Sequence, residues 1–515
     1  MALVRSIATI GGITAVSRVL GFARDVLIAA FLGAGPVADA FFVALRFPNM
    51  FRALFAEGAF SAAFVPLFVA TSESDGPAAA RTFAEQALST LTLALLVFLA
   101  VMLAAMPVAM MALAPGFAGT PAFDLAVQFS RITFPYLLFI SLTALLAGVL
   151  NSLGRFAAPA AAPILLNVVL VSALLVAPPL PTLGHTLSWA VAVAGVVQFL
   201  WLLFHAGAAG MWLRMPRPRL TPKVSLLLRR ALPVAFGAGV YQVNILVGTM
   251  LASLLPAGSV SYLFYADRLN QLPFGILGAA VSTALLPVLS RHVRGGDVRM
   301  ARHSQNRALE FTLLLMLPAA AALIVLAEPF IAVLFQRGAF TAEDVTKTAA
   351  ALTAFAIGLP ALLLIKALTP GFYAREDTST PVRIAVVTTL LNVVLSIVLM
   401  RIYAHVGIAL AASIAAWINA VALAAVLRRR GFLVLDTQIR RRLPRTLLSA
   451  IVMAGVLWLI EGRLGAYLDD GTVEGIAVVA ATVAVGLAVF AVTAHVTGAA
   501  RLADIRRMLR GEDVT

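Results

Sequence analysis

Fourteen stretches of apolar residues, each long enough to cross a lipid bilayer as a helix, run through this chain of 515 residues. A transmembrane helix needs about 20 apolar residues. The stretches cover 7–34, 37–70, 84–112, 124–151, 158–178, 186–213, 229–255, 258–289, 307–335, 345–372, 381–401, 406–427, 444–461 and 474–499. We therefore expect an all-α polytopic membrane protein with about 14 transmembrane helices.

Composition supports a membrane protein and argues against a soluble one. Hydrophobic residues make up 62% of the chain and charged residues 12%, whereas soluble domains are about 25% charged. The sequence has no cysteine, no G-x-x-x-x-G-K-[ST] motif and only six scattered histidines. Disulfides, thiolate metal sites and a P-loop are thereby excluded. We expect no cofactor, no metal site and no enzymatic activity.

The basic residues indicate how the chain is oriented. An even number of spans puts both termini on one side of the membrane. The loops of that side carry 27 of the 38 Lys and Arg residues, and those of the opposite side carry four. Because Lys and Arg are enriched in cytoplasmic loops, we expect both termini in the cytoplasm. The net charge of +15 is then mainly a topology signal, and nucleic-acid binding is not expected.

An internal repeat divides the chain. The segment from Ala34 resembles the segment from Ala257, with Gly35 matching Gly258 and Arg46 matching Arg268. Such repeats are common in transporters. The repeat predicts two parallel six-helix lobes and two extra helices at the C-terminal end. The expected divisions are an N-lobe at 1–215, a C-lobe at 225–430, an extra helix pair at 444–500 and a cytoplasmic tail at 501–515.

Seven basic residues lie outside the loops, and five of them fall inside or close to predicted spans. Arg131 and Lys366 lie near span ends, where long side chains reach the interface. A charge in hydrocarbon costs roughly 2.5–3.5 kcal/mol, so it normally faces a wet cavity or a partner. The five others, together with the acidic residues near them, are Arg18, Arg24, Arg46, Arg52 and Arg268, with Asp25, Asp39, Glu57 and Asp267.

These charges have two interpretations. Guanidinium forks fit phosphate oxygens and stay charged when buried, so an arginine-rich cavity would bind an anion such as a pyrophosphate. The alternative is internal ion pairing, with Arg24 paired to Asp25 or Asp39, Arg52 paired to Glu57, and Arg268 paired to Asp267. Pairing leaves the excess of arginines over acids without an explanation.

Five stretches of the sequence resemble one known family. They are SRVLGFARDVLIAAFLGAG (17–35), ADAFFVALRFPNMFRALFAEGAFSAAFVP (38–66), FPYLLFISLTALLAGVLNSLGRF (134–156), YADRLNQLPFGILGAAVSTALLP (265–287) and PGFYAREDTSTPVRIA (370–385). The family is that of the MurJ (MviN) lipid II flippases, within the multidrug/oligosaccharidyl-lipid/polysaccharide exporter superfamily. The resemblance extends over both predicted lobes.

The resemblance implies a function in peptidoglycan synthesis. Members move lipid II, an undecaprenyl pyrophosphate carrying a disaccharide-pentapeptide, from the cytoplasmic to the periplasmic leaflet of the inner membrane. Alternating access is the implied mechanism, with the extra helix pair forming a groove for the lipid tail. Lipid II, membrane lipid and cell-wall synthesis proteins are the implied partners.

The same resemblance implies which residues bind the substrate. The matching positions are Arg18, Arg24, Asp39, Arg52 and Arg268. Supporting positions, taken from the family pattern and from the charges described above, are Asp25, Arg46, Pro48, Asn49, Glu57 and Asp267.

The sequence also departs from the family. Gln271 stands where some relatives carry a glutamate, and Asn244 and Asn392 stand in spans where one relative has acidic sodium ligands. These differences put sodium coupling in doubt. The alternative functions are export of another polyprenyl-pyrophosphate-linked saccharide, export of a drug, an enzyme acting on polyprenyl phosphates, and a scaffold with a vestigial cavity.

Overall fold

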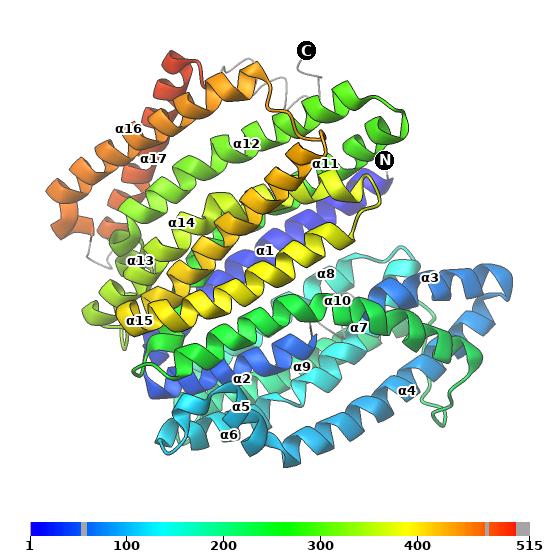
Figure 1. Cartoon of the computed structure of the whole chain (residues 1–515). Coiled ribbons are helices and arrows are strands. Elements are labelled where there is room, and N and C mark those ends of the chain that lie inside the picture. The colour runs from blue at the N-terminus through cyan, green and yellow to red at the C-terminus, as the bar shows by residue number, and fades with distance from the viewer. Residues whose placement is uncertain (1, 53–58, 469–472, 501–515) are drawn as a thin grey trace. The chain divides into compact units, whose positions relative to one another are not determined.

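The structure is a computed structural model, and it describes residues 2–52, 59–468 and 473–500. Helices make up most of these ranges, and no strand occurs in them (Figure 1). The first helices are α1 (Ala2–Leu32), α2 (Pro36–Arg52), α3 (Ala59–Ser74), α4 (Pro77–Ala104), α5 (Met106–Leu113), the 3-10 turn η2 (Pro115–Phe117), α6 (Pro121–Thr133), α7 (Tyr136–Ser152), α8 (Ala157–Val176), α9 (Leu183–Ala208) and α10 (Pro222–Ser253). The others are α11 (Ser259–Arg294), α12 (Val298–Val325), α13 (Ala327–Phe335), α14 (Ala342–Tyr373), α15 (Ser379–Arg429), α16 (Thr437–Leu468) and α17 (Val473–Thr497).

The predicted all-α membrane fold is confirmed, and every predicted span falls on one helix or on two consecutive helices. Nine helical segments of the described ranges are long and apolar enough to cross a membrane. Three predicted spans are divided, over α4 and α5, α6 and α7, and α12 and α13. The predicted span 37–70 covers α2 and α3, and residues 53–58 between them lie outside the described residues. A run of apolar residues does not show where a helix breaks, so the sequence joined these pairs.

Two predicted spans are joined within α15, which changes direction at Ala404. The backbone of Ala404 has φ 48° and ψ −131°, outside the helical region. The chain comes so close to itself here that a Cβ atom on Gly407 would lie 2.3 Å from the carbonyl oxygen of Leu399. Only glycine fits such an approach, so Gly407 permits the bend between the two halves of α15.

The chain forms two compact units, Met1–Ser261 and Tyr262–Thr515. In the first unit α1 packs on α8, α2 on α6, and α7 on α9, while α10 packs on α3. One cluster of buried residues in this unit includes Phe64, whose ring stacks at 5.5 Å on Phe60 and at 5.5 Å on Phe83. These units are groups of contacting helices and not repeats, so the predicted lobe boundaries stay a prediction. The tail at 501–515 lies outside the described residues.

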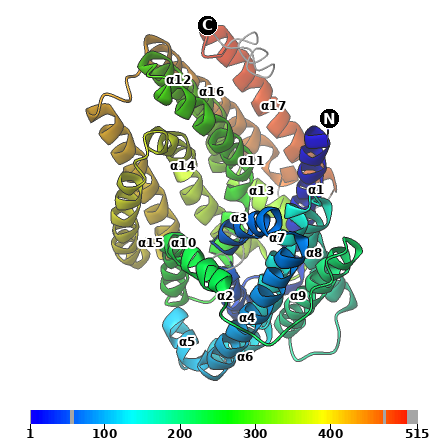
Figure 2. The same cartoon turned by 90° about the vertical axis from the view of Figure 1, so that its right-hand side faces the viewer.

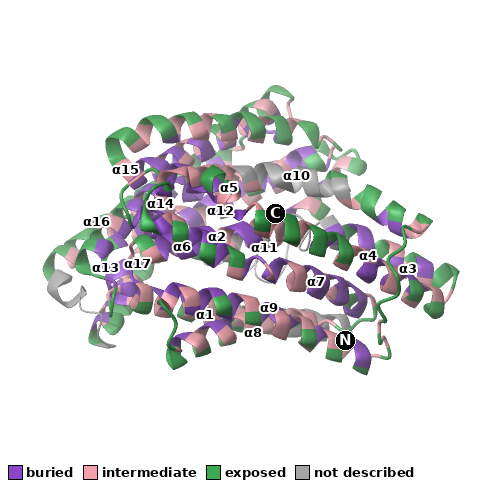
Figure 3. Cartoon of the chain, turned by 90° about the horizontal axis from the view of Figure 1, so that it is seen from below, coloured by how far each residue is buried: buried purple, intermediate pink, exposed green. Residues whose placement is uncertain are grey.

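In the second unit α14 packs on α12 and α15, and α12 packs on α16. Both views show α12 and α16 side by side, with α17 beside α16 (Figures 1 and 2). Many residues along α15 are exposed (Figure 3), and they include Val387, Leu390 and Val394. Exposed apolar side chains along a helix are typical of a surface covered by lipid.

Candidate functional site

Arg24 on α1 is a partly buried arginine whose guanidinium is held from two sides. Its Nε and Nη2 atoms donate to Oδ1 of Asp25, at 3.0 and 2.6 Å. Its Nη1 atom donates to Oδ1 of Asn167 on α8, at 2.9 Å. The amide of Asn167 in turn donates to the backbone carbonyl of Ser17, at 3.0 Å. Of the two predicted acidic partners, Asp25 rather than Asp39 pairs with Arg24 in this structure.

Arg18 lies about two turns before Arg24 on the same helix and differs from it in its surroundings. Its side chain is exposed, and it makes no hydrogen bond or ion pair with any residue that the structure describes. All five N–H groups of its guanidinium are therefore available to a ligand.

Two further arginines of the first unit, both on α2, are partly buried and hydrogen-bonded. Nη1 of Arg46 donates to the hydroxyl of Thr249 on α10, at 2.6 Å. Nε of Arg52 donates to Oδ1 of Asn49 at 3.2 Å, one turn earlier on the same helix. Glu57, the predicted partner of Arg52, lies outside the described residues. The Arg52–Asn49 bond places two predicted site residues in contact.

Pro48 interrupts the hydrogen bonding of α2 next to these arginines. Proline has no N–H, so the carbonyl of Ala44, four residues earlier, lacks its normal helical donor. The hydroxyl of Thr133 on α6 donates to that carbonyl at 3.3 Å. The buried polar group that Pro48 leaves open is thereby satisfied by a neighbouring helix.

Asp39 is 2% exposed and holds the first turn of α11. One carboxylate oxygen accepts a hydrogen bond from the backbone N–H of Gly258, at 2.6 Å. The other accepts from the backbone N–H and the hydroxyl of Ser261, at 2.8 and 2.6 Å. A carboxylate at a helix N-terminus satisfies N–H groups that have no partner in the helix. These contacts give Asp39 a structural role, whatever it contributes to substrate binding.

Arg268 lies on α11 in the second unit, one turn after Phe264. Its guanidinium carbon is 4.7 Å from the centre of the Phe264 ring, a cation–π contact. The neighbouring carboxylate of Asp267 accepts a hydrogen bond from the amide of Gln271. The amide of Gln271 is thus a donor to Asp267, whereas a charged glutamate at position 271 would repel that carboxylate.

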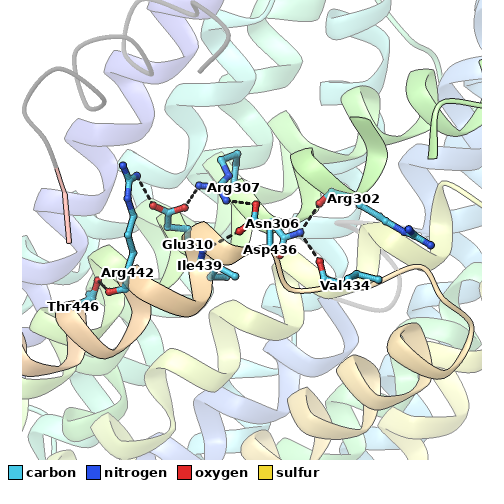
Figure 4. Close-up of polar contacts among 9 residues, drawn as sticks. All are labelled: Arg302, Asn306, Arg307, Glu310, Val434, Asp436, Ile439, Arg442 and Thr446. Carbon is cyan, nitrogen blue, oxygen red and sulfur yellow. Dashed lines mark hydrogen bonds and ion pairs between the residues drawn. The ribbon is translucent and has the colours of Figure 1, made fainter. Parts of the chain in front are cut away.

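A buried ionic cluster in the second unit was not predicted from the sequence. Glu310 on α12 is 8% exposed and pairs with two arginines, Arg307 and Arg442, the latter at 2.7 Å (Figure 4). Arg307 also pairs with Asp436 at 2.5 Å. Arg307 is the first residue of the predicted span 307–335, and Arg442 lies two residues before the predicted span 444–461. In the structure they lie on α12 and α16 and connect these helices through Glu310.

Asn167 and Thr249 were likewise missed as partners of the arginines. Asn167 was detectable in principle, because it is an amide inside the apolar stretch 158–178. Thr249 gave no such signal. No group of three or more metal-ligating side chains occurs among the described residues.

The chain is similar to proteins of known family. A family profile described as lipid II flippase MurJ matches residues 28–473. A protein of Rhizobium tropici named probable lipid II flippase MurJ is 44% identical over 519 residues, covering 99% of this chain and 97% of its own. A solved structure of lipid II flippase MurJ in an inward closed conformation matches with a TM-score of 0.78 and 26% identity, over 95% of this chain and 98% of that one. An inward-facing multidrug resistance transporter of the MATE family matches with a TM-score of 0.69 and 15% identity, over 80% of this chain and 94% of that one, a likeness of fold alone.

Proposed function

We propose that this chain, which belongs to the family of MurJ lipid II flippases, moves lipid II from the cytoplasmic to the periplasmic leaflet of the inner membrane. The observation that carries the proposal is the match to lipid II flippases over nearly the whole chain, in sequence and in fold. The family predicted from the sequence is confirmed by the same matches. The protein is a multi-pass membrane transporter, and catalysis has no part in the proposed activity.

The pyrophosphate of lipid II is the group that the arginines recognise in this proposal. Arg18, Arg24, Arg52 and Arg268 bind it, because guanidinium groups donate in pairs to phosphate oxygens. Asp25 and Asn167 orient Arg24 through the hydrogen bonds described above. Asn49 does the same for Arg52. Arg18 is exposed and is the arginine best placed to meet an incoming anion.

The chain translocates its substrate by alternating access in this proposal, with both termini in the cytoplasm. The excess of basic residues in the loops of one side supports the orientation. The bound pyrophosphate offsets the positive charge of the arginines and favours closure around the substrate. The membrane potential contributes about 2.3 kcal/mol per charge per 100 mV and draws the empty, positively charged site back toward the cytoplasmic side.

Direct binding of lipid II to purified protein tests the proposal. We expect Arg18→Ala, Arg24→Ala and Arg268→Ala each to weaken binding by about tenfold or more, since a hydrogen bond to a charged group contributes roughly 1.5–3 kcal/mol. Arg155→Ala is the matched control, because Arg155 is exposed in the loop before α8. Equal affinity in all four variants and the wild type would refute the role of the arginines.

The choice of ligand distinguishes lipid II from other saccharide lipids. Binding is measured with lipid II, with undecaprenyl pyrophosphate and with a polyprenyl pyrophosphate carrying another saccharide. Tighter binding of the last ligand than of lipid II would favour the alternative exporter function. Cell-wall synthesis proteins remain the partners expected to supply or use the substrate.

A further inference from the structure

The second unit contains a pocket of about 180 Å³ that is separate from the proposed substrate residues. Three segments form it: the turn between α11 and α12 with the adjoining ends of both helices, the residue Arg375 just after α14, and the residues 430–432 just after α15. Arg302, Arg375 and Arg430 line it together with apolar side chains such as Val293 and Phe432. One water needs roughly 10–15 Å³ of such space, so the pocket is large enough for a small polyatomic group.

Two of the three arginines keep unused hydrogen-bond donors. Arg302 donates through Nε and Nη2 to the carbonyl of Gly431, at 3.0 and 2.6 Å. Figure 4 shows its side chain turned away from Glu310. Arg375 donates through Nη1 to the carbonyl of Gly371, at 2.6 Å, and its guanidinium carbon lies 4.0 Å from the centre of the Phe432 ring. Among the described residues, Nη1 of Arg302 and Nε and Nη2 of Arg375 have no hydrogen-bond partner.

The charges of the pocket are unbalanced. Arg430 pairs with Asp377 at 2.6 Å, and no acidic side chain lines the pocket among the described residues. Burial, together with the nearby Arg302 guanidinium, lowers the pKa of Arg375 below its ordinary value. Arg302 and Arg375 therefore repel each other, and an anion between them would relieve that repulsion.

A purely structural role explains only part of this arrangement. α14 and α15 end here, and their terminal carbonyls attract basic side chains. The bonds from Arg302 and Arg375 to backbone carbonyls fit that role, with one arginine at each helix end, but they leave Nη1 of Arg302 and Nε and Nη2 of Arg375 without a use. The remaining donors and the two unpaired positive charges still point toward the same small pocket.

We propose that Arg302 and Arg375 bind a phosphate group in this pocket, supplied by an anionic lipid headgroup or by free phosphate. The position supports both sources. Arg375 lies three residues beyond the predicted span 345–372. Arg302 lies five residues before the span that begins at residue 307, or about 7.5 Å of helix. These distances place the pocket near the level of lipid headgroups, on the side with the basic loops.

Two binding measurements on the full-length protein test this site. Calorimetric titration with inorganic phosphate in detergent reports free phosphate. Native mass spectrometry of protein from nanodiscs containing equal phosphatidylglycerol and phosphatidylcholine reports lipid binding. We expect Arg302→Gln and Arg375→Gln to weaken binding, in whichever measurement detects it, by about tenfold or more. Arg375→Lys keeps the charge but loses the guanidinium fork, and we expect an intermediate loss.

Arg299→Gln is the matched control, because Arg299 is exposed on the first turn of α12 and does not line the pocket. Equal losses in Arg299→Gln and Arg375→Gln would overturn the proposal in favour of a general basic surface. The proposal would also be overturned if the wild-type protein binds no phosphate and shows no lipid preference. That result does not depend on whether any variant folds. The phosphate site shares no residue with the arginines proposed to bind the pyrophosphate of lipid II. A failure of this proposal therefore leaves the lipid II proposal untouched, and the reverse also holds.

Discussion

The guanidinium of Arg24 on α1 donates through Nη1 to Oδ1 of Asn167 on α8, across 143 positions of the sequence. Asn167 is 5% exposed and also binds the backbone of α1 through its amide nitrogen. Its side chain therefore joins two helices at the arginine that the family resemblance places in the substrate site. An amide at this position fixes the orientation of the charge without neutralising it.

Asn167→Ala should weaken lipid II binding by about tenfold, because Arg24 loses one of the groups that orient it. In the double variant Arg24→Ala/Asn167→Ala the loss should be no larger than in Arg24→Ala alone, since the two residues act as one unit. Equilibrium binding of lipid II to the four proteins of this cycle measures the effect. Asn151→Ala, at an exposed asparagine near the end of α7, is the control. Additive losses would contradict the coupling.

Asp39→Ala should lower the thermal stability of the protein. The substitution leaves the N–H groups of Gly258 and Ser261 without their acceptor, and each lost bond to a charged group costs about 1.5–3 kcal/mol. Unfolding followed by intrinsic fluorescence measures the change, and Asp124→Ala, at an exposed position of α6, serves as the control. If stability stays unchanged while lipid II binding falls, Asp39 acts on the substrate and its contacts to α11 are unimportant.

Glu310→Ala should lower the stability of the protein more than the substitution of an exposed charged residue does. It leaves Arg307 and Arg442 without the carboxylate between them, and breaking a buried ion pair costs about 3–5 kcal/mol. The thermal unfolding temperature should fall by several degrees. Glu343→Ala removes the carboxylate of an exposed pair with Lys347, and we expect no measurable change from it. Similar unfolding temperatures for both variants would show that the buried cluster adds no stability.

We expect the thermal stability of the protein to depend on pH through the carboxyl group of Asp377. Hydrogen bonds from Thr380 and from Arg430 hold the pKa of Asp377 well below its ordinary value. A carboxyl with a lowered pKa stabilises the fold above the pKa of the unfolded chain, about 3.9 for Asp, and loses that effect as the pH falls toward its folded pKa.

The wild type should therefore unfold at a higher temperature than Asp377→Asn above about pH 5, and the difference should shrink as the pH falls below about 4. Thermal unfolding at a series of pH values measures it. Asp124→Asn, at an exposed carboxyl of α6, shows how much of the change comes from acid pH in general. A difference between wild type and Asp377→Asn that stays constant from neutral to acid pH would exclude the assigned cause.

Much of the fold was predictable because hydropathy is a local property. The apolar stretches were found by adding up residues within a window of about 20 positions, and all of them are helical in the described ranges. The breaks were not found. The boundary between α6 and α7 lies inside the predicted span 124–151, next to Pro135. The bend at Ala404 depends on a close approach to Leu399 that hydropathy does not register.

The identities of the candidate residues were predictable, whereas their partners were not. Arg18, Arg24, Arg52 and Arg268 stand out in the sequence because charges in apolar spans are costly. The sequence alone also determined the family, through long stretches of matching residues. It left open whether Arg24 pairs with Asp25 or Asp39, since both lie within reach along the chain.

Tertiary structure decided those pairings, because a hydrogen bond depends on which helices pack together. Packing of α1 on α8 brings Asn167 to Arg24. Asp39 instead accepts a hydrogen bond from Gly258 in the turn before α11. Packing of α12 on α16 brings Arg307 and Arg442, both partly buried, to the buried carboxylate of Glu310. The sequence determined which charges are present and where the apolar spans lie, and the packing of distant helices determined which charges are satisfied and which remain available to an anion.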